Sequence, residues 1–511
     1  MTSIEDNLSA LLGSTALVLV GIVLTSVSRI VERVVVARFF SPSVYGEVAM
    51  GLAVLSIGST ISLVGLNHGI PRYLSRFDDE RDLRGTWFVG IVASVITGTV
   101  VSAALLANID RIASLLFDGV DSTGLLRLFV IAVPVNVGVT VGIATLRGME
   151  NTQYKLVAKN VLQPGLRLLI MVGLLASGVG LISIGYAYLA AAAVTLVVAH
   201  LFANRLFSLV GPVRTHFREL ATFSAPLIVT MLLSVLLTRT DTLMLGYFAS
   251  SATAGIYNAA YPLANSLLLV VSAFGYLYLP LTSRLDAENK RGEVSEIYRL
   301  TTKWGYVVTF PAFLVFTVFP GDVVTLFFGG EYVDAAVPLA ILSLGFFTSA
   351  AAGRNRSTLS ALGHTKHILA VDVVTILLNV GLNVLLIPAY SYVGAAVASA
   401  AAYVLRNVAI YAVLHIKCSI TLVSRRMVTV YGTLPLTLVP LSLALSQWLT
   451  LTAITLPAFL VVAGLACLVV VALAGCLEPK DALIVDFIED STGLSVPLVH
   501  RHIPEQTPIR D

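Results

Sequence analysis

Six of the ionisable side chains inside stretches that are otherwise apolar enough to cross a membrane are candidate site residues. They are Arg29, Glu32, Arg33, Arg167, Arg239 and Asp241. Charged groups are costly inside the hydrocarbon layer, so each of them is a candidate functional residue. Most of the set is basic, and guanidinium groups bind phosphate in a bidentate geometry. The set therefore predicts a water-filled cavity that binds an anion such as phosphate or pyrophosphate.

Three of these residues share one helical face. Spacings of three and four residues place Arg29, Glu32 and Arg33 together, and we predict that this face turns away from lipid. A simpler interpretation stays open, in which Glu32 only neutralises Arg29 or Arg33 in an ion pair that holds helices together. Asp241 would then neutralise Arg239 in the same way.

Arg167 is the fourth predicted cargo-binding residue, beside Arg29, Arg33 and Arg239. It lies within a later apolar segment, as does Arg406. Both side chains are long enough to reach the membrane surface if the segment boundaries shift slightly. That alternative also stays open at this point.

The composition fixes the class of protein. Of the 511 residues, 57% are hydrophobic and 12% are charged, about half the charge of a soluble domain. The apolar runs are long and continuous, which indicates membrane-spanning helices and excludes a β-barrel. There is no GxxxxGKS/T motif, and Cys418, Cys467 and Cys476 have no metal-ligand spacing. We expect no catalytic residue, metal, cofactor or nucleic-acid partner.

About fourteen apolar segments can be delimited. They are 13–37, 45–67, 86–108, 124–146, 155–178, 182–204, 220–247, 254–281, 302–325, 332–353, 367–388, 392–416, 427–449 and 454–475. The first is too long for a cleaved signal peptide, so we expect it to remain as a helix. Lys and Arg collect in alternate loops, which predicts that both termini are cytoplasmic. The segmentation thus predicts an all-α integral membrane protein.

The sequence repeats itself at an offset of about 209 residues. The stretch from Phe39 to Gly46 recurs from Tyr247 to Gly255, and Glu32 falls on Asp241. Two parallel six-helix halves with a site between them are typical of transporters. The predicted divisions are an N-lobe 1–206, a C-lobe 207–417, two extra helices in 418–476 and a cytoplasmic tail 477–511. Within the tail, residues 481–490 have the pattern of a short amphipathic surface helix.

Four stretches carry a resemblance to a known family. They are Ala37–Gly46, Asp241–Tyr257, Pro280–Leu285 and Leu382–Ala396. In their order and spacing the chain resembles the Wzx-type polysaccharide and oligosaccharide flippases of the MATE-like (MOP) exporter superfamily. The resemblance implies V-shaped lobes that move a polyprenyl- or dolichyl-linked oligosaccharide across the cell membrane by alternating access. It also implies ion coupling through Glu32 or Asp241, and glycosyltransferases or an oligosaccharide transferase of the same pathway as partners.

Three rival functions are compared with this hypothesis. A multidrug exporter of the same superfamily binds cations and should place acids rather than arginines in its cavity. A relative that flips the peptidoglycan precursor would also have a basic cavity, and the sequence separates it poorly. A membrane glycosyltransferase or ligase should have a larger outer domain than the loop 109–123, whose Asp110, Asp118 and Asp121 are typical of a solvated loop.

Overall fold

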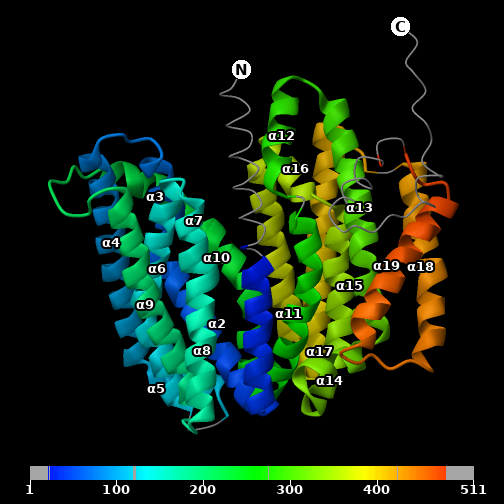
Figure 1. The fold of residues 1–511 in the computed structure, drawn as a ribbon, viewed down its shortest axis with the longest axis horizontal. Helices are drawn as coiled ribbons and strands as arrows, with labels where there is room; N and C mark the ends of the chain where they lie inside the picture. Colours follow the sequence, from blue (N-terminus) through cyan, green and yellow to red (C-terminus); the bar gives the residue numbers. More distant parts are fainter. Residues whose placement is uncertain are drawn as a thin grey trace. The chain divides into compact units, whose positions relative to one another are not determined.

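The computed structural model describes residue 21 and residues 23–118, 122–273, 275–422, 424–478 and 481. These residues form helices joined by short loops, and no β-strand occurs among them (Figure 1). They fall into two compact units. Unit 1 contains residues up to 259 together with 380–395, and unit 2 contains 260–379 together with the residues from 396 onward. The protein is an all-α integral membrane protein, as its composition predicts.

Unit 1 begins with a helix over residues 23–39. The helices that follow are α2 (Pro42–Leu63), α3 (Leu66–Leu74), α4 (Glu80–Ala107), α5 (Ile109–Leu116), α6 (Thr123–Gly148), α7 (Thr152–Lys155), the π-helix η2 (Leu156–Leu162), α8 (Gln163–Ala176), α9 (Ile182–Leu206), α10 (Phe217–Phe248) and the start of α11 (Ser251–Ala273). Local signals set several starts. Pro42 occupies the first turn of α2, and the Asp79 carboxylate caps α4 by accepting from the Arg81 amide at 2.9 Å.

Unit 2 continues with the rest of α11. Its other helices are α12 (Gly275–Ala287), α13 (Arg291–Val318), α14 (Pro320–Phe328), the 3₁₀ helix η3 (Gly330–Ala335), α15 (Ala336–Ala352), α16 (Asn355–Ala361), α17 (Thr365–Cys418), α18 (Arg425–Ser446) and α19 (Thr455–Leu473). A kink at Ser391, whose φ is 52°, divides α17 near the predicted boundary between segments 367–388 and 392–416. The part of α17 over residues 380–395 belongs to unit 1.

Ten helices of the described residues are long and apolar enough to cross a membrane. An eleventh span arises if α13 and α14 count as one, although they meet at 86°. The predicted segment 302–325 missed this bend. Its cause is Pro320, which disfavours helical geometry at Phe319 before it and starts a new helix. The count of fourteen crossings and the four predicted divisions of the chain stay predictions.

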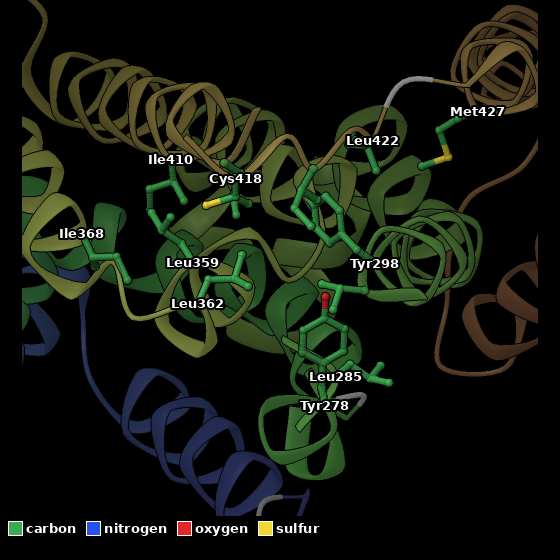
Figure 2. Close-up of a cluster of buried hydrophobic side chains, with 13 residues drawn as sticks. Tyr278, Leu285, Tyr298, Leu359, Leu362, Ile368, Ile410, Cys418, Leu422 and Met427 are labelled. Carbon is green, nitrogen blue, oxygen red and sulfur yellow. The ribbon is translucent and has the colours of Figure 1, made fainter. Parts of the chain in front are cut away.

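A compact apolar cluster organises one end of unit 2. Figure 2 shows its side chains converging from α12, α13, α16, α17 and α18. The hydroxyl groups of its two tyrosines have hydrogen-bond partners. The Tyr278 hydroxyl lies 2.7 Å from Thr358 Oγ1, and the Tyr298 hydroxyl donates to the Ala352 carbonyl at 2.7 Å. Cys418 packs in this cluster, and Cys467 and Cys476 are also buried. All three cysteines thus pack as small apolar side chains.

One described residue of the predicted tail corrects the prediction made for it. The sequence places Asp481 on the polar face of a surface helix, but its side chain is fully buried in unit 2. Its carboxylate accepts from Lys303 Nζ at 2.5 Å and from Trp304 Nε1 at 2.8 Å, both on α13. A buried carboxylate requires such partners, and helical periodicity cannot reveal them. Residues 482–490 of the predicted amphipathic helix lie outside the described residues.

Two repeat-related glycines let the backbones of α2 and α11 touch. A Cβ atom at Gly46 would lie 1.8 Å from the Ser251 carbonyl oxygen, and one at Gly255 would lie 1.8 Å from the Pro42 carbonyl oxygen. Neither obstacle is a flexible side chain, so the contact requires glycine on both helices. These are the two glycines that the sequence repeat aligns.

We expect Gly46→Ala to lower the free energy of unfolding by about 1–3 kcal/mol, because the added methyl group must push two backbones apart. Gly255→Ala should have a similar effect. Thermal unfolding in detergent measures both. Gly173→Ala is the matched control, because a Cβ atom at that helical position has nothing within 4 Å. Equal stability of the Gly46 and Gly173 variants would contradict the close contact.

Candidate functional site

Unit 1 encloses a polar cavity of about 350 Å³. The first helix, α2, α6, α8, α9, α10 and the start of α11 each contribute residues to its wall. Its charged lining residues are Arg29, Glu32, Arg33, Arg167 and Arg239. Its polar neutral lining residues include Tyr45, Ser56, Asn136, Gln163, Tyr188 and Asn258. Four guanidinium groups therefore face the cavity against one carboxylate.

The cavity gathers five of the six predicted site residues. They come from the first helix, α8 and α10, which are far apart in the sequence. Asp241 is the exception: it is buried on α10, two residues beyond Arg239, and does not line the cavity. The structure thus places the predicted cargo-binding arginines together and one predicted acid outside their group.

Glu32 is held by partners from two other helices. Its carboxylate lies 2.5 Å from the Arg167 guanidinium on α8 and accepts a hydrogen bond from the Tyr188 hydroxyl on α9. The Arg167 guanidinium also stacks over the Tyr188 ring, 4.3 Å from its centroid. The side chains of Arg167 and Glu32 are only 16% and 8% exposed. This is a buried ion pair with hydrogen-bond support.

This geometry corrects both open alternatives for these residues. Glu32 forms its ion pair with Arg167, not with Arg29 or Arg33 as its sequence neighbours suggested. Arg167 does not extend to the membrane surface, because its guanidinium is fixed at the cavity wall. Among the described residues, no carboxylate lies within ion-pair distance of Arg29 or Arg33. Arg29 is exposed and Arg33 is half-buried.

Asp241 accepts hydrogen bonds from two other helices. The Asn383 amide on α17 donates to one of its oxygens at 2.7 Å, and the Tyr257 hydroxyl on α11 donates to the other at 2.5 Å. Nearby, Thr242 and Asn258 exchange hydrogen bonds at 3.1 and 3.3 Å. Asp241 thus joins α10 to α11 and α17 through buried hydrogen bonds.

Sequence reasoning assigned no role to the neutral residues of these two networks. Tyr188, Tyr257 and Asn383 each contact a predicted acid. The sequence signal for these residues is a neutral polar side chain within an apolar helix, which is a weaker signal than a charged side chain there. Arg406, by contrast, belongs to unit 2 and does not line the cavity; its guanidinium lies 4.7 Å from the Tyr403 ring centroid. The part of the chain that the structure describes contains no cluster suited to a metal ion.

Comparison with known sequences identifies relatives. The family described as polysaccharide biosynthesis protein matches residues 35–338. A protein of Haloferax volcanii, named "Probable low-salt glycan biosynthesis flippase Agl15", is 26% identical over 235 residues, which cover 46% of this chain and 49% of that protein. Two further curated relatives are matched over 34% of their own length. The chain thus spans about half, or less, of the length of the curated relatives it matches.

Solved structures show the fold. The lipid II flippase MurJ in an inward closed conformation aligns with a TM-score of 0.68 at 12% identity, covering 92% of this chain and 99% of that one. An inward-facing multidrug resistance MATE transporter of the MOP superfamily aligns with a TM-score of 0.62 at 16% identity, covering 77% and 96%. The chain therefore has the fold that these transporters share.

The Glu32–Arg167 pair gives a test of the cavity wall. We expect Glu32→Gln to lower the free energy of unfolding by about 3 kcal/mol, because Arg167 would remain buried without a counter-charge. Arg167→Gln should be similarly harmful. The loss of unfolding free energy in the double variant should be smaller than the sum of the losses in the two single variants. A double-mutant cycle of thermal unfolding in detergent measures this difference.

The matched control for this test is the exposed pair between Arg127 and Asp110, whose closest atoms are 3.4 Å apart. Asp110→Asn should change stability by less than about 0.5 kcal/mol. Additive effects of the Glu32 and Arg167 substitutions would show that the two side chains do not depend on each other.

Proposed function

The chain belongs to the polysaccharide biosynthesis protein family, and from this premise we propose that it is a flippase for a lipid-linked oligosaccharide. The cargo is a glycan on a polyprenyl or dolichyl phosphate or pyrophosphate. The protein moves it from the cytoplasmic to the outer leaflet of the cell membrane by alternating access, with both protein termini in the cytoplasm. The flipped glycan serves surface polysaccharide assembly or protein glycosylation.

The arginine-lined cavity carries this proposal. Guanidinium groups bind the phosphate oxygens of the carrier through charge-assisted hydrogen bonds. Neutral polar groups in the same wall, such as Ser56, Asn136 and Gln163, suit the hydroxyl groups of a sugar. The lipid tail stays in the bilayer while the polar headgroup crosses. The names of relatives such as Agl15 agree with this cargo.

Export of cationic drugs is the rival with the same fold. A cation in this cavity would meet four guanidinium groups and one carboxylate that already pairs with Arg167. Coulomb repulsion disfavours that occupant. A glycosyltransferase or ligase would need an acid or base free to act on the sugar, and Glu32 is engaged. We therefore propose a transporter rather than an enzyme.

Asp241 is the better candidate of the two acids for ion coupling. Removing Glu32 from its partners would leave a buried guanidinium unpaired, which is costly. Asp241 accepts hydrogen bonds from the Asn383 amide and the Tyr257 hydroxyl. We propose that Asp241 binds the coupling proton or cation, and that Glu32 positions Arg167.

The function as a whole is tested in a strain that lacks the gene. Lipid-linked glycans are extracted, and the finished surface glycan is assayed. Accumulation of a complete lipid-linked glycan with loss of the surface glycan supports flipping. A truncated lipid-linked glycan would instead indicate an enzyme, and unchanged glycans with altered drug sensitivity would indicate an exporter.

We expect the double variant Arg29→Ala, Arg33→Ala to lose transport while still inserting into the membrane. Removing both charges takes away the phosphate contacts without disturbing the Glu32–Arg167 pair. Restoration of the surface glycan in the deletion strain measures this, and membrane fractionation checks insertion. Arg111→Ala, in a predicted outer loop, is the control and should complement fully. Full complementation by the double variant would move the cargo site elsewhere.

A second prediction concerns coupling. Asp241→Asn should reduce flipping in proteoliposomes about tenfold and remove its dependence on an imposed proton or sodium gradient, because an amide cannot bind the coupling ion. Glu32→Asn is unsuitable as a control because of the ion pair, so Asp110→Asn is used. A gradient dependence that survives in the Asp241 variant would exclude this residue from coupling.

A further inference from the structure

Basic and polar side chains form a stripe along one helix of unit 1. Lys155, Lys159, Gln163 and Arg167 follow one another at intervals of four residues along α7, η2 and α8. Residues four apart lie on the same helical face. At about 1.5 Å per residue the stripe extends for about 18 Å. We call these four residues the basic stripe.

One end of the basic stripe is part of the candidate site. Gln163 and Arg167 both line the cavity. Toward the other end, Lys159 interacts electrostatically with Lys155, with Arg29 and with Arg147 on α6. The basic stripe therefore continues from the cavity wall toward the end of the helix that the loop charges predict to be cytoplasmic.

The helix that carries the basic stripe is fixed in place. The Asn160 amide, next to Lys159, donates to the Gly21 carbonyl at 2.9 Å and to Thr25 Oγ1 at 2.5 Å. The local π-helix has a cause in the sequence, because Pro164 has no N–H to give to the carbonyl four residues earlier. The Gln163 amide instead donates to the Ala158 carbonyl, five residues back. Such π-helical turns are frequent at functional sites.

The charges on this face repel one another. Like charges four residues apart destabilise a helix. Among the described residues, no carboxylate lies within ion-pair distance of Lys155, Lys159 or Arg29. Enrichment of basic residues at cytoplasmic ends accounts for Lys155 but not for Lys159. Lys159 lies a further turn into a helix long enough to span a membrane, and it interacts electrostatically with Arg29. An anionic ligand would relieve this repulsion.

We infer that the basic stripe is a loading site that binds the phosphate or pyrophosphate of a lipid headgroup and passes it to Arg29. This inference rests on the proposed function, which supplies the lipid-linked cargo. Lys155 and Lys159 bind the headgroup first, as point charges that suit phosphate. Gln163 and Arg29 then receive it at the cavity. The basic stripe increases the rate at which cargo enters the cavity at limiting cargo concentration. It is not needed for the step in which the headgroup crosses the membrane.

The test uses the full-length protein in lipid nanodiscs, with geranylgeranyl pyrophosphate as the probe. The double variant Lys155→Gln, Lys159→Gln should raise the Kd for the probe about tenfold, as expected for the loss of charge-assisted contacts. The double variant with arginine at both positions should bind within about twofold of the wild type, which separates charge from packing. Lys366→Gln, a basic residue of unit 2 on the same predicted side, is the matched control and should bind normally.

Transport assays separate this site from the cavity. The glutamine variant should flip slowly at limiting cargo and approach the wild-type rate at saturating cargo, whereas the Arg29, Arg33 double variant should fail at both. If the glutamine variant unfolds, Lys159→Gln alone is measured in the same way, with an increase in Kd of about threefold expected.

Three results would overturn all or part of the proposal. Probe binding by the glutamine variant equal to that of Lys366→Gln, with normal flipping, would overturn the loading site and leave the flippase function standing. If inorganic pyrophosphate displaces the probe as effectively as unlabelled geranylgeranyl pyrophosphate does, the site binds a free anion rather than a lipid headgroup. A wild-type protein that flips no lipid-linked glycan, yet loses probe binding when the lysines are replaced, would overturn the proposed function alone.

Discussion

The buried ion pair between Glu32 and Arg167 is the contact on which the cavity of unit 1 depends. It joins the first helix to α8 at 2.5 Å, and Tyr188 adds a hydrogen bond and a stacked ring from α9. A guanidinium group inside membrane-spanning helices needs a counter-charge or water. Because Glu32 satisfies Arg167, the arginine can form part of a rigid wall. Arg29 and Arg33 then have no carboxylate within ion-pair distance among the described residues, and both line the cavity.

The two acids that the repeat aligns have diverged in their surroundings while keeping one feature. Each accepts a hydrogen bond from a tyrosine, Tyr188 for Glu32 and Tyr257 for Asp241. The second partner differs, since it is a guanidinium for Glu32 and the Asn383 amide for Asp241. Removing the charge of Glu32 would leave the Arg167 guanidinium buried without a counter-charge. The two acids that the sequence repeat aligns thus share a tyrosine donor and differ in the other partner described.

Hydropathy and the cost of buried charge were enough to predict the class, most helices and five residues that line the cavity. Those signals are local in the sequence. The ion-pair partner of a buried charge is not a local property of the sequence. Arg167 is distant from Glu32 in the chain, whereas the spacing of Arg29 and Arg33 favoured them as partners of Glu32. The same limit explains Asp481, whose burial against Lys303 and Trp304 depends on tertiary packing. Predicted boundaries failed where proline chemistry intervened within an apolar run, as at the bend between α13 and α14.

The fold does not distinguish a flippase from a drug exporter, because a lipid II flippase and a multidrug resistance transporter both align with this chain, at TM-scores of 0.68 and 0.62. What differs between such functions is the sign of the charge at the cavity wall. In a low-dielectric setting an excess of guanidinium groups attracts anions and repels cations over several ångströms. The basic stripe extends the same sign beyond the cavity, along a face whose lysines repel one another. A protein that binds cations would gain nothing from that repulsion, whereas an anionic headgroup approaching from the membrane would be attracted along the whole path.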